Sequence, residues 1–351
     1  MNIYPDMSGI GSVAKLYYEM LSQMPEFESI TFYQALEHKY VNPPVKNCVI
    51  WNNVHKLPHF LEIFVSRILS IPKHIESIPE QLLILVDPTI SFHSKSKKKR
   101  LVIVHDLRPF TEFETNLGEK IYYYVIKRSL LSCDFFICDS RFTGRELKKL
   151  GVNEEKIAVI YPFINNQEMT SIRALSNKEI TITYIANNLP YKNIRFFIDL
   201  AYALSSRNTG PKNFKFFLIT NDADYKIKQL ISDDLNLSVL PKVADINQIY
   251  SATDIYVTPS LYEGIGLPVL EAMSHGIPVV AGNIPVNIEL IKGYGILCNS
   301  NILDEWIKSI FSLTDPKIYA EYSLKSLEKT KIFTKDYFIK TLKDNMIKLT
   351  Q

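Results

Sequence analysis

Cysteine is scarce in this sequence, and its few cysteines show no paired spacing of the kind that holds a metal. Cys133 and Cys138 flank the start of a predicted strand, so we interpret them as core residues rather than ligands. The full set is Cys48, Cys133, Cys138 and Cys298. This usage indicates a reducing compartment.

The sequence also lacks segments that direct a chain to or through a membrane. Its first residues, MNIYPDMSGIG, are not a basic segment followed by an apolar run, so no signal peptide is predicted. Lys127 and Arg128 interrupt the tyrosine-rich segment near Tyr122, and no apolar stretch reaches about eighteen residues. We therefore expect a cytoplasmic protein without a membrane span, with peripheral contact at the inner membrane face as an open alternative.

Charge of one sign is not in large excess. The formal net charge of +3 is too small to argue for nucleic acid as a partner. By contrast, 46% of the residues are hydrophobic, which is enough to build sizeable cores. A length of 351 residues suits two domains better than one.

The recurring unit along the chain is a short apolar run, a turn and an amphipathic helix. Runs of this kind predict parallel sheets covered by helices on both faces, and therefore two doubly wound α/β domains. In the first half, the predicted strands are 82–86, 101–104, 135–138 and 157–161, and the predicted helices are 13–21, 118–131 and 141–150. In the second half, the predicted strands are 180–185, 214–219, 237–240, 255–257 and 279–281, and the predicted helices are 194–205, 246–252, 268–275 and 303–311.

A polar segment, NNQEMTSIRALSN at 165–177, follows a completed strand and is the predicted domain boundary. It separates an N-terminal domain at 1–165 from a C-terminal domain at 178–335. Residues 336–351 carry a helical pattern with no strand after it, so we expect this helix to pack back onto the N-terminal domain.

The most informative stretch is EGIGLPVLEAMSHG, at residues 263–276. Pro268 favours the start of a helix and Gly276 favours its end, so a short helix follows a glycine-containing loop. Gly264 and Gly266 let the loop backbone approach a ligand closely. The N-terminus of the helix favours an anion such as phosphate.

Two carboxylates, Glu263 and Glu271, bracket this predicted anion site. Carboxylates accept hydrogen bonds from sugar hydroxyls, and a nucleotide sugar carries hydroxyls on both sides of a diphosphate. Two glutamates at this spacing also occur by chance as surface residues beside a turn. The full string PSLYEGIGLPVLEAMSHG, at residues 259–276, is far less common.

That string, extended to PSLYEGIGLPVLEAMSHGIPVV, resembles the signature of the retaining glycosyltransferases of family 4. Other segments resemble the same family and extend the likeness over nearly the whole chain: SGIGSVAKL, VIVHDLRPF, FICDSRFTGRELKKLGVNEEKIAVIYPFI and YIANNLPYKN. The resemblance implies the GT-B fold, in which two Rossmann-like domains face each other across a cleft. It also implies a reaction that retains the anomeric configuration, without a metal, a cofactor or a protein nucleophile.

The resemblance further implies roles for the matched residues. Glu271 would hold the ribose hydroxyls of the donor, and Glu263 would hold the hydroxyls of the donor sugar. Lys192 would neutralise the diphosphate leaving group, and His105 would face the transferred sugar from the opposite wall. The remaining implied donor-binding residues are Gly9, Ile10, Gly11, Asn187, Val243, Gly264, Ile265, Gly266 and Leu267. Of these, Gly9 to Gly11 would line the acceptor and phosphate side, and Val243 would lie near the base.

One position departs from the family pattern. The family usually has an arginine five positions before the phosphate-binding lysine, and this chain has Asn187 there. A neutral amide therefore replaces a planar cation, which puts stabilisation of the leaving group in question. Arg195 and Lys242 are candidate substitutes, and the sequence does not decide between them.

Several motifs carry a plainer interpretation. His105 alone would be a histidine packed at a strand end, and Lys192 alone an ordinary surface lysine. The glycine pair at 8–11 lacks the third glycine of a dinucleotide site, which disfavours a nicotinamide enzyme. The D-x-D at 222–224 is interpreted as a loop. The run SKSKKKR at 94–100 precedes a predicted strand and is either a solvated loop or a contact with anionic lipid headgroups.

These patterns together predict a retaining, metal-independent hexosyltransferase. Its donor would be a GDP- or UDP-linked sugar, and its acceptor a hydroxyl of a glycan or lipid-linked glycan in surface polysaccharide biosynthesis. The alternative from another class is a non-catalytic partner subunit that binds a sugar nucleotide or a glycan. A third interpretation is an enzyme of the same architecture, such as an epimerase, that acts on the nucleotide sugar itself.

Overall fold

The computed structural model divides into two compact units. One unit contains residues 1–161 and 338–351, and the other contains residues 162–337. The division falls slightly before the predicted boundary at 165–177. The structure describes residues 17, 20–23, 32–36, 48–52, 82–85, 98–108, 124–125, 127–164, 173–175, 179–206, 213–220, 225–241 and 245–350.

The C-terminal unit is built on a six-stranded sheet in which every pair is parallel, ordered β12-β11-β10-β7-β8-β9. Its strands are β7 (Glu179–Ile185), β8 (Asn213–Ile219), β9 (Leu237–Leu240), β10 (Ile255–Thr258), β11 (Val279–Gly282) and β12 (Ile296–Cys298). The chain builds outward from β7 in one direction, then returns to place β10 on its other side. This is the strand order of a nucleotide-binding Rossmann domain, with its switch point between β7 and β10.

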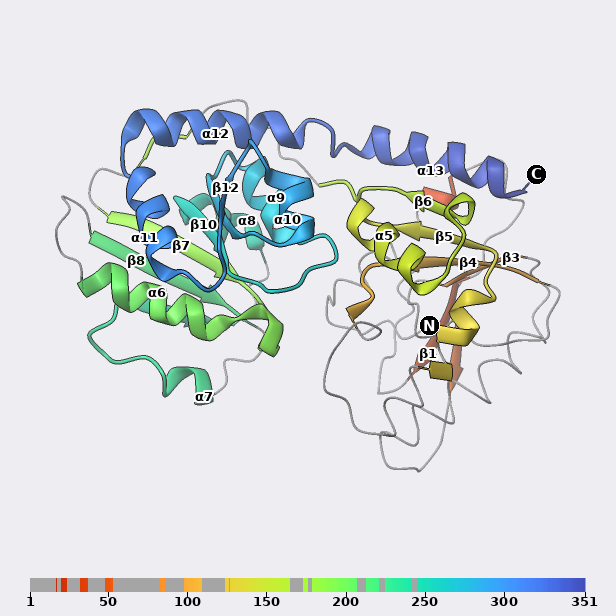
Figure 1. Ribbon diagram of the computed structural model, residues 1–351, viewed down its shortest axis with the longest axis horizontal. Coiled ribbons are helices and arrows are strands. Elements are labelled where there is room, and N and C mark those ends of the chain that lie inside the picture. Colours follow the sequence, from red (N-terminus) through yellow and green to blue (C-terminus); the bar gives the residue numbers. More distant parts are fainter. Residues whose placement is uncertain are drawn as a thin grey trace. The chain divides into compact units, whose positions relative to one another are not determined.

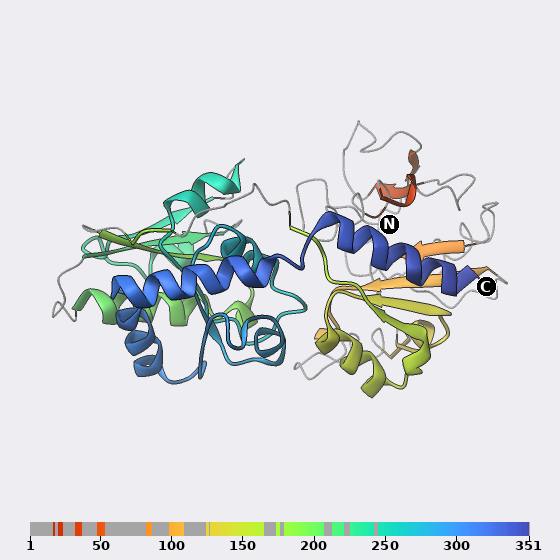
Figure 2. The ribbon, with the colours of Figure 1, turned by 90° about the horizontal axis from the view of Figure 1, so that it is seen from above.

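Helices cover both faces of this sheet. Figures 1 and 2 show α6 along one face and α12 across the other. The helices of this unit are α6 (Ile194–Ser206), α7 (Tyr225–Lys228), α8 (Ile246–Ala252), α9 (Leu267–Ser274), α10 (Pro285–Ile291), α11 (Leu303–Ser312) and α12 (Pro316–Thr330). On the α6 face, Phe197, Phe216 and Trp306 are fully buried in one apolar cluster with α11. Each such side chain contributes about 1.5–3 kcal/mol of burial free energy.

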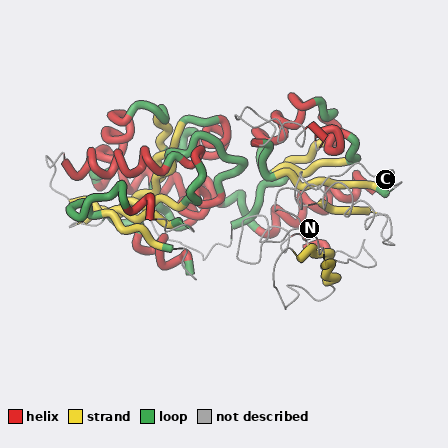
Figure 3. Tube along the Cα trace, turned by 90° about the horizontal axis from the view of Figure 1, so that it is seen from below, coloured by secondary structure: helices red, strands yellow, loops and turns green. Residues whose placement is uncertain are grey.

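The N-terminal unit contains a four-stranded parallel sheet in chain order β3-β4-β5-β6. Its strands are β3 (Leu82–Leu85), β4 (Lys99–Val104), β5 (Phe135–Cys138) and β6 (Ile157–Val159). Two further strands, β1 (Phe32–Leu36) and β2 (Cys48–Asn52), pair in parallel in a separate sheet. Figure 3 shows the strands of each unit gathered together, with helices packed over them.

Helix α5 (Arg141–Leu150) has the bounds that its sequence predicts. The Ser140 side chain accepts a hydrogen bond from the Thr143 backbone N–H at 3.1 Å, which caps the N-terminus. At the other end, Gly151 adopts φ 106°, a left-handed conformation that glycine accommodates without strain. The predicted N-cap and terminating glycine are both confirmed.

The last helix, α13 (Lys335–Thr350), carries an apolar stripe. Phe338, Leu342 and Met346 recur every fourth residue and are all buried. The Phe338 ring lies 5.4 Å from the Tyr17 ring in an edge-to-face contact. From Phe338 onward the helix therefore belongs to the N-terminal unit, and Figure 2 shows it running over the strands of that unit.

Several elements differ from the sequence prediction. The prediction missed β1, β2, β12, α7, α10 and α12. Helix α12 was not predicted because its buried face includes Ser323, Ser326 and Thr330 instead of an apolar stripe. The Ser326 hydroxyl donates to the Ile277 carbonyl at 2.9 Å, and the Ser323 hydroxyl accepts from the Arg173 backbone N–H at 3.0 Å, so tertiary hydrogen bonds satisfy both serines.

Cysteine placement agrees with the prediction where the structure describes it. Cys133, Cys138 and Cys298 are free and buried, and burial raises the pKa of the Cys133 thiol to about 11. These thiols are core residues. Among the described residues, no helix combines the length and apolar character needed to cross a membrane.

Candidate functional site

Two loops meet at the switch point of the C-terminal sheet. Because β7 and β10 are parallel neighbours, the loops that leave their carboxyl ends emerge at the same edge. Backbone N–H of Leu261 donates to the Tyr191 carbonyl at 2.8 Å, and the Asn193 side chain donates to the Pro259 carbonyl at 3.3 Å. These bonds tie the loop after β7 to the loop after β10.

A buried tyrosine in the sheet also contacts both of these loops. Tyr184, in β7, donates its hydroxyl hydrogen to the Lys192 carbonyl at 2.6 Å and lies 2.9 Å from the Ser260 hydroxyl. Burial raises the pKa of Tyr184 well above its ordinary value, so the hydroxyl stays protonated and can donate. Asn193 follows a short 3-10 turn, Pro190–Lys192, with φ 53°. The turn sets where the Lys192 side chain leaves the backbone.

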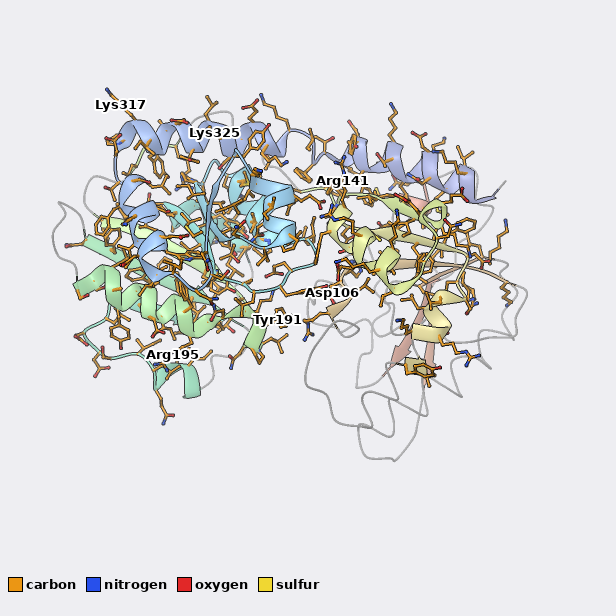
Figure 4. The ribbon with its side chains drawn as sticks, viewed as in Figure 1. Asp106, Arg141, Tyr191, Arg195, Lys317 and Lys325 are labelled. Carbon is orange, nitrogen blue, oxygen red and sulfur yellow. The ribbon has the colours of Figure 1, made fainter. Side chains whose placement is uncertain are left out.

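Lys192 and Glu263, far apart in the sequence, form an ion pair at this junction. The Lys192 amine lies 2.6 Å from a Glu263 carboxylate oxygen, and the two side chains are only 16% and 14% exposed. The amine also lies 5.3 Å from the centroid of the Tyr191 ring, and Tyr191 is labelled in Figure 4. The structure therefore brings together two of the three predicted catalytic residues.

Glu263 leads into the predicted glycine-containing loop. Gly266 adopts φ 69° and directly precedes α9, which begins at Leu267, one residue earlier than predicted. The loop backbone is packed tightly, because Ile265 and Gly266 are buried and Gly264 is half-buried. The loop and the N-terminus of α9 have the geometry that favours an anion.

Glu271, on the following helix, has a partner that the sequence did not indicate. Buried Tyr250 of α8 donates its hydroxyl hydrogen to a Glu271 carboxylate oxygen at 2.6 Å. Burial, followed by the charge of Glu271, raises the pKa of Tyr250 well above its ordinary value, so this donor remains protonated. The His275 ring stacks on Tyr250 with centroids 5.0 Å apart. Tyr250 and His275 thus fix the orientation of the predicted ribose-binding carboxylate.

Asn187, which replaces the expected arginine, is exposed on the loop after β7. Its candidate substitute Arg195 is 67% exposed and pairs with Asp199 one turn further along α6, at 3.2 Å. The other candidate substitute, Lys242, lies outside the described residues. So do the predicted residues Gly9, Ile10, Gly11 and Val243, and the D-x-D at 222–224.

In the N-terminal unit, His105 is paired with a buried carboxylate. His105 directly follows β4, Asp139 directly follows β5, and the register aligns Val104 with Cys138. The His105 ring nitrogen Nδ1 lies 2.5 Å from the Asp139 oxygen Oδ2, and the side chains are 15% and 6% exposed. Sequence reasoning missed Asp139, although the predicted adjacency of two parallel strands could have suggested it.

The basic run at 94–100 is a correction to the sequence interpretation. Strand β4 begins at Lys99, so the end of the run is sheet rather than a loop. Arg100 is buried and donates to the Ser132 carbonyl at 2.8 Å, while Lys99 remains exposed. The buried Arg100 is therefore not part of a surface contact.

Across the described ranges, no three histidine, cysteine, aspartate or glutamate side chains gather closely enough to hold a metal ion.

Two known families match the chain in sequence. The family described as Glycosyltransferase Family 4 matches residues 63–168, and the family described as Glycosyl transferases group 1 matches residues 179–315. Together the two matches cover more than half of the chain; the first lies mainly in the N-terminal unit and the second in the C-terminal unit.

Two characterised relatives illustrate the likeness. The O-antigen chain mannosyltransferase RfbU of Salmonella typhimurium is 26% identical over 234 residues, covering 62% of this chain and 62% of that protein. The UDP-Gal:alpha-D-GlcNAc-diphosphoundecaprenol alpha-1,3-galactosyltransferase of Escherichia coli is 32% identical over 177 residues, covering 48% of this chain and 44% of that protein. The chain thus spans less than two thirds of the length of each.

Solved structures of the same architecture are also similar. Sucrose-phosphate synthase from Thermosynechococcus elongatus matches with a TM-score of 0.74 and 14% identity, over 98% of this chain and 94% of that one. Anabaena HepE in complex with UDP-glucose matches with a TM-score of 0.67 and 15% identity, over 86% of each chain. At these identities the likeness establishes the fold, which is GT-B.

Proposed function

This chain belongs to the group 1 glycosyltransferases of family 4, and from that membership we propose that it is a retaining, metal-independent hexosyltransferase. It moves a sugar from a nucleotide-sugar donor to a hydroxyl of a glycan or lipid-linked glycan during surface polysaccharide biosynthesis. The relatives named for O-antigen mannosyl transfer and for galactosyl transfer to a diphosphoundecaprenol-linked sugar support this acceptor class.

The observation that carries the proposal is the Lys192–Glu263 pair at the switch point, beside the N-terminus of α9. Cleavage of a glycosyl–diphosphate bond builds negative charge on the leaving group. A lysine and a helix N-terminus stabilise such charge without a metal. This geometry therefore supports a site for a nucleoside diphosphate leaving group more than it supports an ion pair with a purely structural role.

Each carboxylate has a distinct role in the proposed donor complex. Glu271, oriented by Tyr250, accepts hydrogen bonds from the ribose hydroxyls. Glu263 accepts hydrogen bonds from the transferred sugar, and Lys192 turns from Glu263 towards the diphosphate when the donor binds. His105 contacts the transferred sugar.

The proposed reaction proceeds by front-face displacement. The bond between the anomeric carbon and the phosphate oxygen breaks, and its electron pair leaves with the diphosphate. The acceptor hydroxyl bonds to the same face of the anomeric carbon, and its proton passes to the departing phosphate oxygen. Because the new bond replaces the old one on one face, the anomeric configuration is retained.

The donor base stays open between uridine and guanosine. Anabaena HepE was solved with UDP-glucose, which supports a UDP-linked donor for a protein of this fold. The proposal also includes peripheral contact with the membrane that would hold a lipid-linked acceptor. In the described part of the basic run, Lys99 is exposed and would lie at such a contact.

Calorimetry with a panel of UDP- and GDP-sugars, in the presence of EDTA, tests the donor site. We expect one donor to bind the wild type, and the Glu271→Ala variant to bind it at least about 10-fold more weakly, since a charged hydrogen-bond acceptor is lost. Glu321→Ala is the matched control, because Glu321 is an exposed glutamate of the same unit that pairs only with a neighbouring lysine. Equal binding by both variants would refute the assigned role of Glu271.

One observation supports a second candidate, a non-catalytic partner subunit. Asn187 supplies no positive charge to the diphosphate, and Arg195 is paired elsewhere. Incubation of the donor with extracted lipid-linked glycans, followed by mass spectrometry, separates the two candidates. A product heavier by one sugar supports the transferase, whereas donor binding without either transfer or a change in the donor supports the partner subunit. Conversion of the donor into an isomer would instead indicate an epimerase.

A further inference from the structure

A buried carboxylate in the N-terminal unit stands beside His105. Asp139 is 4% exposed and stands at the carboxyl end of β5, directly before the N-cap of α5. Of the described side chains, only the His105 ring lies within hydrogen-bond distance of its carboxylate. A buried carboxylate is stable only if it has such a partner, and the N-terminus of α5 adds a favourable dipole.

Two buried groups close to the pair are neutral. Tyr17 and Cys138 lie close to Asp139, and burial raises the pKa of each well above its ordinary value, with the charge of Asp139 as a further cause. Neither group therefore carries a negative charge that would compete with Asp139 for the hydrogen of the His105 ring.

The geometry also decides which nitrogen of His105 can act on a ligand. The contact joins Asp139 Oδ2 to Nδ1 at 2.5 Å. A carboxylate only accepts hydrogen bonds, so Nδ1 must carry the hydrogen in the pair. In the neutral ring, Nε2 is then the nitrogen with a lone pair.

We propose that Asp139 is a positioning residue for sugar transfer: it holds the His105 ring in one orientation and in the Nδ1–H form, so that Nε2 accepts a hydrogen bond from a hydroxyl of the transferred sugar. This inference rests on the proposed function, because it assigns His105 a ligand. The pairing itself exists in the free protein, and it can be measured without any transfer reaction.

The first test is the tautomer of His105 in the free protein. Long-range proton–nitrogen correlation spectra of protein labelled with 15N-histidine distinguish the two tautomers, and His105→Gln identifies the signal among the seven histidines. At a pH where the ring is neutral, we expect the wild type to show the Nδ1–H form. We expect Asp139→Asn to lose this preference, because an amide can donate to Nδ1. A wild-type ring in the Nε2–H form, or an unchanged tautomer in Asp139→Asn, overturns the proposal.

The second test is kinetic. We expect Asp139→Asn to lower kcat by about 100-fold. Loss of the residue that orients a metal-binding histidine lowers activity by about 10- to 100-fold, and loss of the aspartate of a catalytic triad lowers it by about 10⁴-fold. Donor affinity measured by calorimetry should fall much less than kcat, because the residues proposed to hold the ribose and the diphosphate, Glu271 and Lys192, lie in the other unit. Asp139→Glu should restore part of kcat. An unchanged kcat in Asp139→Asn overturns the positioning role.

Asp134→Asn is the matched control. Asp134 precedes the same strand at its other end and accepts a hydrogen bond from the Arg100 backbone at 2.8 Å. Thermal unfolding checks that both variants fold. A protein with the Nδ1–H form but no transfer activity on any acceptor would refute the proposed function and leave the pairing intact. An active protein with the Nε2–H form would support the proposed function and refute the proposed role of Asp139.

Discussion

The two units present their candidate residues in different ways. In the C-terminal unit, the predicted residues cluster within one loop and helix, residues 263–271, and the loop after β7 adds Lys192. In the N-terminal unit, the predicted His105 stands alone in its motif, and its partner Asp139 comes from another strand. The residues of the first site are mostly close together in the sequence. The residues of the second site come from two strands that the sheet register brings side by side.

This contrast shows where the chemistry of each site resides. A loop followed by a helix N-terminus binds an anion mainly through its own backbone, so local sequence is enough to recognise it. A histidine needs a second group to fix its tautomer, and that group is free to come from any neighbouring element. In this chain, both cross-strand pairs form at the carboxyl edges of parallel sheets, where neighbouring loops converge.

The largest effect should come from breaking the pair that joins the two loops of the C-terminal site. We expect Lys192→Met to lower kcat by about 100- to 1000-fold, because the charge on the leaving group loses a preorganised cation. Transfer kinetics at saturating donor measure this change. Lys308→Met is the control, since Lys308 is exposed on α11 of the same unit. A variant that retains the wild-type kcat would show that the Lys192–Glu263 pair is only structural.

The next effect compares one glycine from each unit. Gly266 has φ 69°, so we expect Gly266→Ala to lower the free energy of unfolding by about 1–2 kcal/mol. Gly144 lies inside α5, where a Cβ atom would meet the Ile157 and Val159 side chains at ordinary distances of 3.5 and 3.6 Å. We expect Gly144→Ala to raise the free energy of unfolding by about 0.5–1 kcal/mol.

Denaturant unfolding of the two alanine variants, followed by circular dichroism, measures both changes. Opposite signs would confirm that backbone strain at the glycine-containing loop, and not tight packing in general, sets the requirement for Gly266. Two variants of the same sign would contradict that account.

The smallest effect should come from replacing Asn187 with the arginine that the family usually has at this position. We expect Asn187→Arg to lower the Kd for the donor by about two- to fivefold, since an exposed ion pair contributes at most about 1 kcal/mol. The neighbouring Asn188→Arg adds the same charge one residue away and is the matched control. Calorimetry at two salt concentrations measures both. An equal gain in the two variants would indicate general attraction by charge, without a specific role for position 187.

Much of the fold could be predicted from local patterns. Helix α5 was predicted to the residue, because an N-cap serine and a terminating glycine bound its periodic segment. Strand β8 was predicted to within one residue by its apolar run. Helix α12 was not, because its buried serines, Ser323 and Ser326, form hydrogen bonds to other segments, which no local period reveals.

For the candidate site, the sequence alone determined the glycine-containing loop, the helix that follows it, and the chemical types of Glu263, Glu271, Lys192 and His105. Only the tertiary structure decided their partners: Lys192 with Glu263, Tyr250 with Glu271, and Asp139 with His105. The physical reason is the range of the interactions. Caps, turns and helix periods act over a few residues, whereas hydrogen-bond partners are chosen by the strand order and register that carry distant loops to one edge of a sheet.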